Sequence, residues 1–321
     1  MHSLQYFSTT FEAQFSMAGF PTSPEKLYEA CDYFLRLGGK RIRPVSVLMG
    51  NELFGDVTAD AFRVATAVEL FHNFTLVHDD IMDEAPLRRN RETVHVKYGE
   101  PTALLAGDVM MVRAYQFLTQ VNPEQLPRIL TLFNKTATEV CEGQQLDMNF
   151  EVQEEVSFEE YLHMITLKTS VLLAASLQLG AILGGAGLGN QHHLYEFGKK
   201  LGIAFQVQDD YLDAFGDPEK FGKQPGGDIL ANKKTFLLIH ALETLDEKGR
   251  KHLKGLMQSG EPGKVGKVLD VFSDCKVDSW AKSLKEKYFN EALRHLEDVA
   301  VLSTRKKELA AFAAFLMMRE N

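Results

Sequence analysis

The chain has 321 residues, 45% of them hydrophobic and 25% charged, which is typical of a soluble globular protein with a large buried core. Its formal net charge of −9 disfavours a nucleic-acid partner, because nucleic-acid binding requires Lys and Arg to neutralise phosphates. Three scattered cysteines without a CxxC pair favour a reducing, cytoplasmic compartment over a disulfide framework.

Long apolar segments with helical periodicity follow one another along the chain, for example at 61–83 and 102–120, and alternating strand patterns are scarce. The first residues show no basic flank followed by an apolar run, so we expect no secretory signal. From position 246 onward, charged and apolar residues alternate as in solvated outer helices. The pattern predicts an all-α single domain over residues 1–321, with about ten or more helices.

One apolar stretch, at 169–189, approaches the length of a membrane span. It contains Gln178 and several small residues, and no positively charged loop pattern surrounds it. We interpret it as a fully buried helix and expect no membrane span, with a membrane helix as the alternative.

A basic segment, Gly38-Gly39-Lys40-Arg41-Ile42-Arg43-Pro44, lies near the N-terminus. The glycines allow the backbone to approach a ligand closely, and arginine can hold phosphate oxygens through two parallel hydrogen bonds. By itself the signal is weak, because a basic loop is usually just solvated.

Two aspartate clusters share one spacing: LVHDDIMD at 76–83 and QVQDDYLD at 206–213. In a helix, Asp79 and Asp83 lie on one face, since residues four apart are one turn from each other. Each cluster ends an apolar run, where the helix terminus carries partial negative charge and disfavours carboxylates. Because Mg²⁺ prefers carboxylate and phosphate oxygens, the repeat predicts two facing clusters that hold a Mg²⁺–diphosphate complex. The alternative is an accidental acidic surface, which one copy would allow more readily than two.

Cationic and polar residues accompany these clusters. His72 lies two turns before Asp79 on the same face, although a lone histidine in an apolar helix is more often a core residue. Lys168-Thr169 begins the apolar helix at 169–189, and a lysine at the edge of such a helix can also be a solvated surface residue. We favour contact with diphosphate for the residues of this group: His72, Arg88, Arg89, Lys168, Thr169, Lys223 and Lys233.

The ordered motifs resemble those of the trans-isoprenyl diphosphate synthases, the polyprenyl synthetase family that includes farnesyl and geranylgeranyl diphosphate synthases. The resemblance covers roughly residues 36–240 and includes EGQQLD at 142–147 and Lys168-Thr169. It implies an all-helical fold around a deep central cavity, a homodimer, and about three Mg²⁺ ions per active site.

The resemblance also assigns roles to individual residues. The isopentenyl diphosphate site corresponds to Lys40, Arg43, His72 and Arg89. The Mg²⁺ ligands correspond to Asp79, Asp83 and Asp209, supported by Asp80, Asp210 and Asp213. The surroundings of the allylic diphosphate correspond to Arg88, Lys168, Thr169, Gln206, Lys223 and Lys233, with Gln144 and Asp147 on a neighbouring helix. The C-terminal residues Met318-Arg319-Glu320-Asn321 lack the basic tail of some relatives, so closure by the tail is not expected.

The implied reaction joins isopentenyl diphosphate to an allylic diphosphate. In this family a large residue five positions before the first motif limits elongation, and Phe74 occupies that position, with the smaller Thr75 beside it. The first motif also lacks the two-residue insertion of typical bacterial farnesyl synthases. These features resemble the archaeal type of geranylgeranyl synthase, so we expect a C20 product, with C15 as the alternative.

Other functions compete with this interpretation. A class I terpene cyclase shares the first aspartate motif, but it would normally carry a different second motif and would not need GGKRIRP. A non-catalytic subunit of a heteromeric synthase would normally lose one of the motifs. A metal-binding structural protein would leave the ordered cations unexplained.

Overall fold

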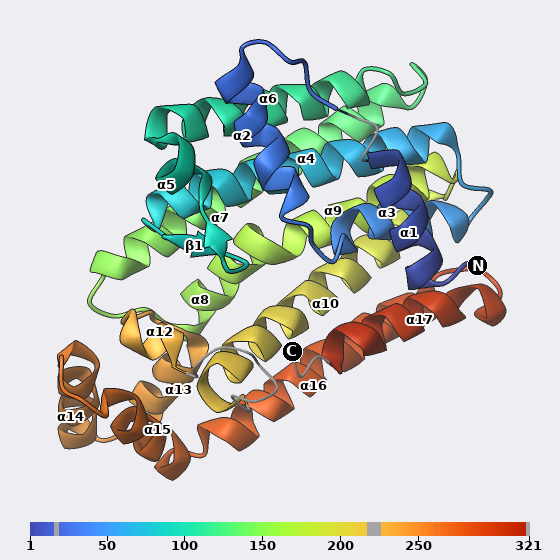
Figure 1. Ribbon diagram of the computed structural model, residues 1–321. Coiled ribbons are helices and arrows are strands. Elements are labelled where there is room, and N and C mark those ends of the chain that lie inside the picture. The colour runs from blue at the N-terminus through green and yellow to red at the C-terminus, as the bar shows by residue number, and fades with distance from the viewer. Residues whose placement is uncertain (16–18, 217–225, 319–321) are drawn as a thin grey trace. The chain divides into compact units, whose positions relative to one another are not determined.

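The computed structural model describes residues 1–15, 19–216 and 226–318, and helices dominate these residues (Figure 1). The all-α prediction is therefore confirmed. The chain divides into two compact units: Met1–Lys135, Ala175–Tyr195 and Val299–Glu308 form the first, and Thr136–Ala174, Glu196–Asp298 and Leu309–Asn321 form the second. The single domain and its deep central cavity stay predictions.

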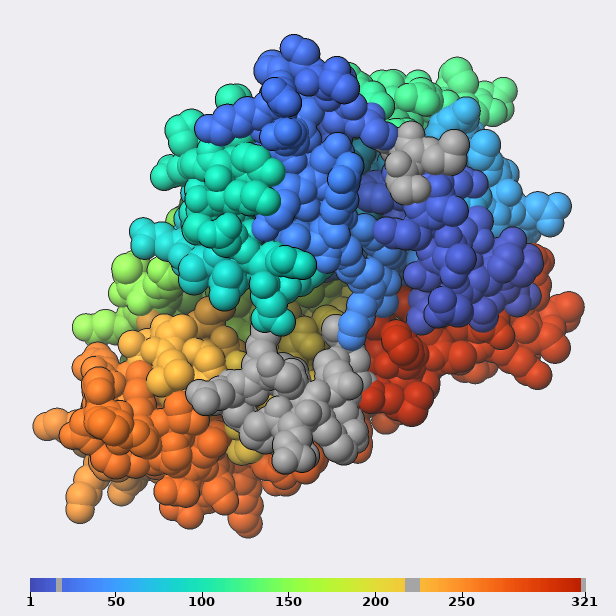
Figure 2. Space-filling view, in the orientation of Figure 1, coloured from blue at the N-terminus to red at the C-terminus, as the bar shows by residue number. Residues whose placement is uncertain are grey.

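The first unit holds the N-terminal elements. They are α1 (Leu4–Phe15), α2 (Glu25–Arg36), α3 (Ile42–Glu52), α4 (Ala59–Met82), β1 (Leu87–Arg88), β2 (Arg91–Glu92), α5 (Val94–Tyr98) and α6 (Glu100–Leu118). Parts of α7 (Leu126–Val152), α9 (Val171–Leu183), α10 (Leu188–Phe215) and α17 (Ser303–Met317) complete it. The dark-blue α1 lies on the surface of this unit (Figure 2).

Helix α4 is the centre of the first unit and carries the first aspartate cluster at its end. Thr58 caps its start, because the Thr58 hydroxyl accepts a hydrogen bond from the Ala61 backbone N–H at 3.2 Å. Its residues are apolar on most faces and largely buried, and it packs against α3 and α6 (Figure 1). Burial on several sides explains why the sequence shows a nearly continuous apolar run here.

The apolar stretch at 169–189 packs part of its length against α3. A Cβ at Gly180 would lie 2.1 Å from the Val47 carbonyl oxygen, and one at Gly50 would lie 2.4 Å from the Leu177 carbonyl oxygen. The glycines therefore allow the backbones of α3 and α9 to touch. By length and composition Phe158–Leu183 could cross a membrane, but 72% of its most apolar window is buried, as in the core helix of a globular protein.

The second unit contains the other elements. They are α8 (Phe158–Ile165), the π-helical turn η1 (Thr166–Ser170), α12 (Gly227–Leu230), α13 (Phe236–Thr244), α14 (Glu247–Gln258), α15 (Lys264–Asp274) and α16 (Val277–Asp298), with the remaining parts of α7, α9, α10 and α17. Its core includes Tyr161, Phe236 and Phe272.

The sequence interpretation that Lys168-Thr169 begins the apolar helix is wrong. The continuous helix starts at Phe158, after a capping box in which Ser157 and Glu160 exchange hydrogen bonds. Lys168 and Thr169 instead lie in η1, in the interior of this helix. The capping box lies within an acidic loop, outside the apolar run, so the run alone placed the start too late.

Candidate active site

The first aspartate cluster lies where the sequence predicts, at the C-terminal end of α4. Asp79 and Asp80 belong to the last turn, and Asp83 is the residue directly after the helix. The Asp80 side chain is buried, the Asp79 side chain is 20% exposed, and Asp83 is exposed. Asp79 and Asp83 are therefore the accessible carboxylates, one turn apart on the same face.

Arg88 neutralises the buried member of this cluster. Its Nε donates to both carboxylate oxygens of Asp80, at 2.8 and 2.9 Å, and its Nη2 donates to Asp79 Oδ2 at 3.4 Å. Burial raises the pKa of Asp80, while the hydrogen bond and charge of Arg88 act against that rise. Arg88 thus holds Asp80 in place and also makes a longer contact with Asp79.

A two-residue hairpin turn aims Arg88 and Arg89. Strands β1 and β2 pair Leu87 with Glu92 and Arg88 with Arg91, so Arg89 and Asn90 form the turn. Both turn residues have left-handed backbone angles, with φ of 53° and 61°. This is the type I′ geometry that fits a twisted hairpin, and it costs on the order of 1 kcal/mol at Arg89, a residue with a Cβ.

Glycine at position 39 makes room for Arg89. A Cβ added to Gly39 would lie 3.0 Å from Nη2 of Arg89, so a side chain there would displace the guanidinium. The backbone of the basic segment and the hairpin turn are therefore in close contact. Burial, followed by the charges of Arg41 and Arg88, lowers the pKa of Arg89.

His72 and Arg43 form a direct pair. Arg43 Nη1 lies 3.0 Å from His72 Nε2, and a guanidinium can only donate, so the histidine accepts. Burial and then the charges of Arg43, Arg89, Arg88 and Arg41 lower the pKa of His72 well below its usual range. The first unit thus gathers several guanidinium groups around one neutral imidazole. Such an arrangement can bind a diphosphate through charge-assisted hydrogen bonds.

Lys40 is exposed, between Gly39 and Arg41. The first unit therefore contains all four residues expected to bind isopentenyl diphosphate, on one loop, two helices and one hairpin. Their role in binding stays a prediction.

Phe74 lies in a cluster of rings with tilted and edge-to-face contacts, five residues before Asp79. Its ring centroid is 4.7 Å from that of His78 and 5.5 Å from that of Phe71. His78 is fixed by α6, since its Nε2 is 3.1 Å from the Leu104 carbonyl oxygen and a Cβ at Gly107 would lie 2.3 Å from it. Thr75 turns back to its own helix, where its hydroxyl donates to the His72 carbonyl oxygen at 2.8 Å. The role of Phe74 and Thr75 in setting product length stays a prediction.

The second aspartate cluster lies near the C-terminal end of α10, in the second unit. Asp210 is buried and accepts hydrogen bonds from the Tyr161 hydroxyl and from Gln206 Nε2, the latter at 2.8 Å. Burial, with the nearby Asp228 charge, raises the pKa of Asp210 to about 8. Asp209 is only partly buried. As in the first cluster, the second aspartate is enclosed and the first is more accessible.

Asp213 serves as a cap for the short helix α12. Its Oδ2 accepts from the Asp228 N–H at 2.9 Å, and its carbonyl oxygen accepts from the Gly226 N–H at 2.5 Å. Lys233 follows α12, with its Nζ 3.9 Å from Asp228 Oδ1. Lys223 and residues 319–321 lie outside the described residues.

The π-helical turn η1 presents Lys168 and Thr169. It is packed between two helices that each place a glycine against it: a Cβ at Gly143 would lie 2.2 Å from the Lys168 backbone nitrogen, and one at Gly202 would lie 2.8 Å from the Ser170 Cα. Single π turns within α-helices frequently occur at functional sites. The glycine of the EGQQLD motif therefore has a packing reason that the sequence did not reveal.

Polar contacts connect this turn to its surroundings. Lys168 Nζ lies 2.5 Å from Asp147 Oδ2, and the Thr169 hydroxyl donates to Gln206 Oε1 at 3.4 Å. Because Gln206 in turn donates to Asp210, Thr169, Gln206 and Asp210 form a chain of hydrogen bonds. The second unit contains Lys168, Thr169, Gln206 and Asp210 and adds Tyr161, which no sequence motif indicated; the roles of these residues stay predictions.

The donor set fits magnesium. The accessible aspartates of each cluster supply carboxylate oxygens, which Mg²⁺ prefers, and each cluster lies near the negative end of its helix, where a cation is favourable. The assignment of Asp79, Asp83 and Asp209 as the principal Mg²⁺ ligands stays a prediction. Asp80, Asp210 and Asp213 are engaged by Arg88, by Tyr161 with Gln206, and by α12.

Known proteins resemble this chain along nearly its whole length. A model of the polyprenyl synthetase family matches residues 24–275. The geranylgeranyl diphosphate synthase of Methanosarcina mazei is 39% identical over 303 residues, 93% of this chain and 91% of that protein. The geranylfarnesyl diphosphate synthase of Natronomonas pharaonis is 36% identical over 304 residues, 86% and 89% of the two chains. A crystal structure of a geranylgeranyl pyrophosphate synthase matches with a TM-score of 0.95 and 42% identity, over 100% of both chains.

Proposed function

Since the chain belongs to the polyprenyl synthetase family, we propose that it is a trans-prenyltransferase that joins isopentenyl diphosphate head-to-tail (1′-4) to allylic diphosphates and releases geranylgeranyl diphosphate. The observation that carries this proposal is the cluster of Arg43 and Arg89 around the neutral His72, in the same unit as the aspartates that Arg88 contacts. Relatives named geranylgeranyl diphosphate synthase support the product.

The isopentenyl diphosphate binds to Lys40, Arg43, His72 and Arg89. The neutral state of His72 supports this role, because an imidazole that accepts from Arg43 orients the guanidinium, and an oriented guanidinium can form charge-assisted hydrogen bonds with phosphate oxygens. The fixed turn at Arg89 supports it too, since a pre-set guanidinium loses little freedom on binding.

The allylic diphosphate binds near Arg88, Lys168, Thr169, Gln206, Lys223 and Lys233. Family members are in general magnesium-dependent, and we propose three Mg²⁺ ions per active site, held chiefly by Asp79, Asp83 and Asp209. When bound, Mg²⁺ supplies positive charge that stabilises the negative charge developing on the diphosphate. Arg88 and Lys168 add fixed positive charge for the same leaving group.

The allylic carbon becomes cationic when its C–O bond breaks, and dipoles of the protein stabilise this positive charge. Thr169 and Gln206 present oxygen atoms near the backbone carbonyls of η1, and partial negative charge of this kind stabilises a cation. The double bond of isopentenyl diphosphate then forms the new C–C bond, and a proton leaves to the released diphosphate. The motifs contain no obvious general base of their own, which supports that destination for the proton.

Product length depends on Phe74, as we propose, with Thr75 beside it. The bulk of Phe74 and its contacts with Phe71 and His78 support a rigid limit on the growing chain. A C15 product is the alternative if the limit lies closer to the reacting carbons. We also propose that the enzyme is a cytoplasmic homodimer, since family members usually pair.

The test is incubation of purified protein with Mg²⁺, labelled isopentenyl diphosphate and each of the C5, C10 and C15 allylic diphosphates, followed by sizing of the product. We expect elongation with a dominant C20 product. No elongation with any primer, from folded protein with metal present, would overturn the proposal and favour a non-catalytic subunit or a terpene cyclase.

A further inference from the structure

The middle arginine of GGKRIRP differs from its neighbours, because its side chain is buried and turned into the protein. Arg41 is only 4% exposed, whereas Lys40 is exposed. A buried guanidinium is costly unless it is fully paired, so its partners indicate what it does.

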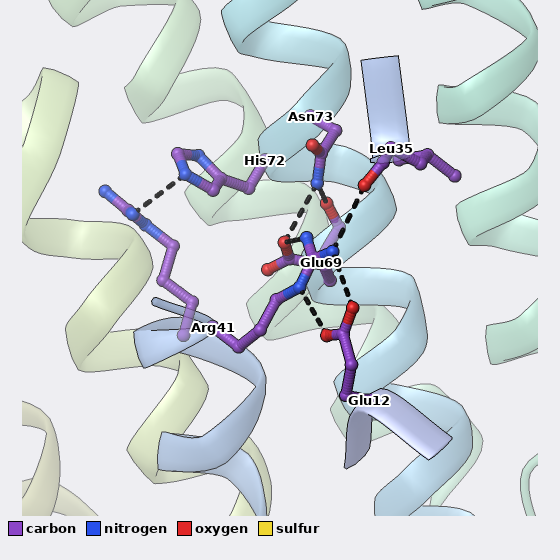
Figure 3. A network of polar contacts seen from close by, with 7 residues as sticks. Glu12, Leu35, Arg41, Glu69, His72 and Asn73 are labelled. Carbon is purple, nitrogen blue, oxygen red and sulfur yellow. Dashed lines mark hydrogen bonds and ion pairs between the residues drawn. The ribbon is translucent and has the colours of Figure 1, made fainter. Parts of the chain in front are cut away.

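Arg41 is held by three helices of the first unit (Figure 3). Its Nη1 donates to Glu69 of α4 at 2.5 Å, and its Nε and Nη2 donate to Glu12 of α1 at 2.8 and 3.3 Å. Its Nη2 also donates to the Leu35 carbonyl oxygen of α2 at 3.2 Å. The ring of Phe15 lies 5.0 Å from the guanidinium carbon. The guanidinium therefore joins α1, α2 and α4 to the loop that bears it.

The Glu69 end of this network is rigid and the Glu12 end is accessible. Glu69 is buried and also accepts a hydrogen bond from Asn73 Nδ2 at 3.0 Å. The Glu12 side chain is 53% exposed, on a helix at the surface (Figure 2). Glu12 is thus the contact that can be altered without leaving a charge buried and alone.

The backbone at Arg41 explains why this network matters for the candidate site. Arg41 has φ of 49°, a left-handed conformation that is unfavourable for a residue with a Cβ, directly before α3. Such a conformation persists only when the surroundings impose it. The backbone conformation of Arg41 therefore sets the orientation of Lys40, which precedes it, and of Arg43, which follows it in α3.

There is room for the loop to move when the network is loosened. An open surface pocket of about 490 Å³ lies against the network, lined by Ser8, Thr9, Glu12, Ala13, Gly39 and Arg41. Gly39 also contacts Arg89, so a shift of this loop would move Lys40 and disturb Arg89 together.

We propose that Arg41 is a positioning residue and that its ion pair with Glu12 of the N-terminal helix is needed for this role. The pair fixes the loop whose cations receive isopentenyl diphosphate, so α1 takes part in recognition of that substrate without touching it. This inference rests on the proposed function, because it concerns the same diphosphate site.

The experiment compares Glu12→Gln and Arg41→Lys with wild type and with the control Glu25→Gln, an exposed glutamate at the start of α2. KM for isopentenyl diphosphate, KM for the allylic diphosphate and kcat are measured separately. Glu12→Gln weakens one charge-assisted contact, and we expect KM for isopentenyl diphosphate to rise roughly tenfold, with the allylic KM within about twofold of wild type. Arg41→Lys keeps the buried charge but loses the planar guanidinium that donates to several partners at once, so it should show the same selective rise in KM for isopentenyl diphosphate.

The outcomes separate this inference from the proposed function. If wild type elongates and both variants keep its KM for isopentenyl diphosphate, the positioning role is wrong and the enzyme assignment stands. Equal rises in both KM values, or a fall in kcat alone, would likewise overturn it, because they indicate general loosening. If wild type does not elongate at all, the proposed function itself fails. Circular dichroism and the urea midpoint establish that each variant is folded.

Discussion

Arg43 Nη1 lies 3.0 Å from His72 Nε2, and this contact requires the imidazole to be the acceptor. Because the guanidinium has no lone pair to offer, protonation of His72 would replace a hydrogen bond by two like charges in contact. Acidification that protonates His72 therefore breaks the contact, whereas a rise in pH leaves the neutral imidazole unchanged.

We expect His72 to make the folded protein less stable as the solution becomes acidic. Its pKa is lowered in the folded state, so between pH 6.5 and that lower value the unfolded chain binds the extra proton. Stability is then fully present above about pH 6.5 and falls by up to about 1.4 kcal/mol per pH unit below it. His72→Gln, which can still accept from Arg43, should lose this component. Urea unfolding of both proteins at pH 7.5 and 5.5 measures the difference, and equal losses in the two proteins would contradict it.

Asp79 is expected to be essential for turnover. Replacing Asp79 with Ala removes an accessible carboxylate of the first cluster, and we expect kcat to fall by at least about a hundredfold. Asp56→Asn, an exposed aspartate outside the clusters, is the matched control. Chelation of metal should abolish wild-type elongation, and added Mg²⁺ should restore it. Near-normal activity of Asp79→Ala would refute the assigned role.

Gly143 is expected to be necessary for the π-helical turn that carries Lys168 and Thr169. A Cβ there would lie 2.2 Å from the Lys168 backbone nitrogen, and backbone cannot give way as a side-chain tip can. We expect Gly143→Ala to cost about 1–3 kcal/mol of stability and to lower kcat.

The matched control for that prediction is Gly255→Ala in α14, where a Cβ would meet nothing within 4 Å. Alanine there should raise stability by about 0.5–1 kcal/mol and leave kcat unchanged, because alanine is the better helix former. Thermal unfolding and steady-state rates measure both variants. A Gly143→Ala enzyme as stable and active as wild type would show that η1 does not need the close contact.

Phe74→Ala is expected to lengthen the product. Removing the ring opens space one turn before the aspartates, and the loss of a buried aromatic should also cost about 3–5 kcal/mol of stability. Chromatographic sizing of the extracted product tests the change, with Phe74→Leu as a milder variant. Phe71→Leu, in the same cluster of rings, should be destabilised without a longer product. An unchanged product from folded Phe74→Ala would show that Phe74 does not limit the length of the product.

The sequence by itself determined the helical class and the positions of both aspartate clusters. Periodicity and helix geometry are local properties, so Asp79 and Asp83 could be placed on one face of a helix end without a structure. The cations beside them were also found from local motifs, because their residue types and spacing carry the chemistry.

Only the tertiary structure decided which members of each motif are enclosed by the protein. Asp210 meets Tyr161, 49 positions away, and Arg41 meets Glu69 and Glu12, 28 and 29 positions away. No local period encodes such partners, because the fold creates them when distant helices pack together. The same holds for Gly143. Glycine is needed there because the backbone of η1 lies too close to leave room for a side chain.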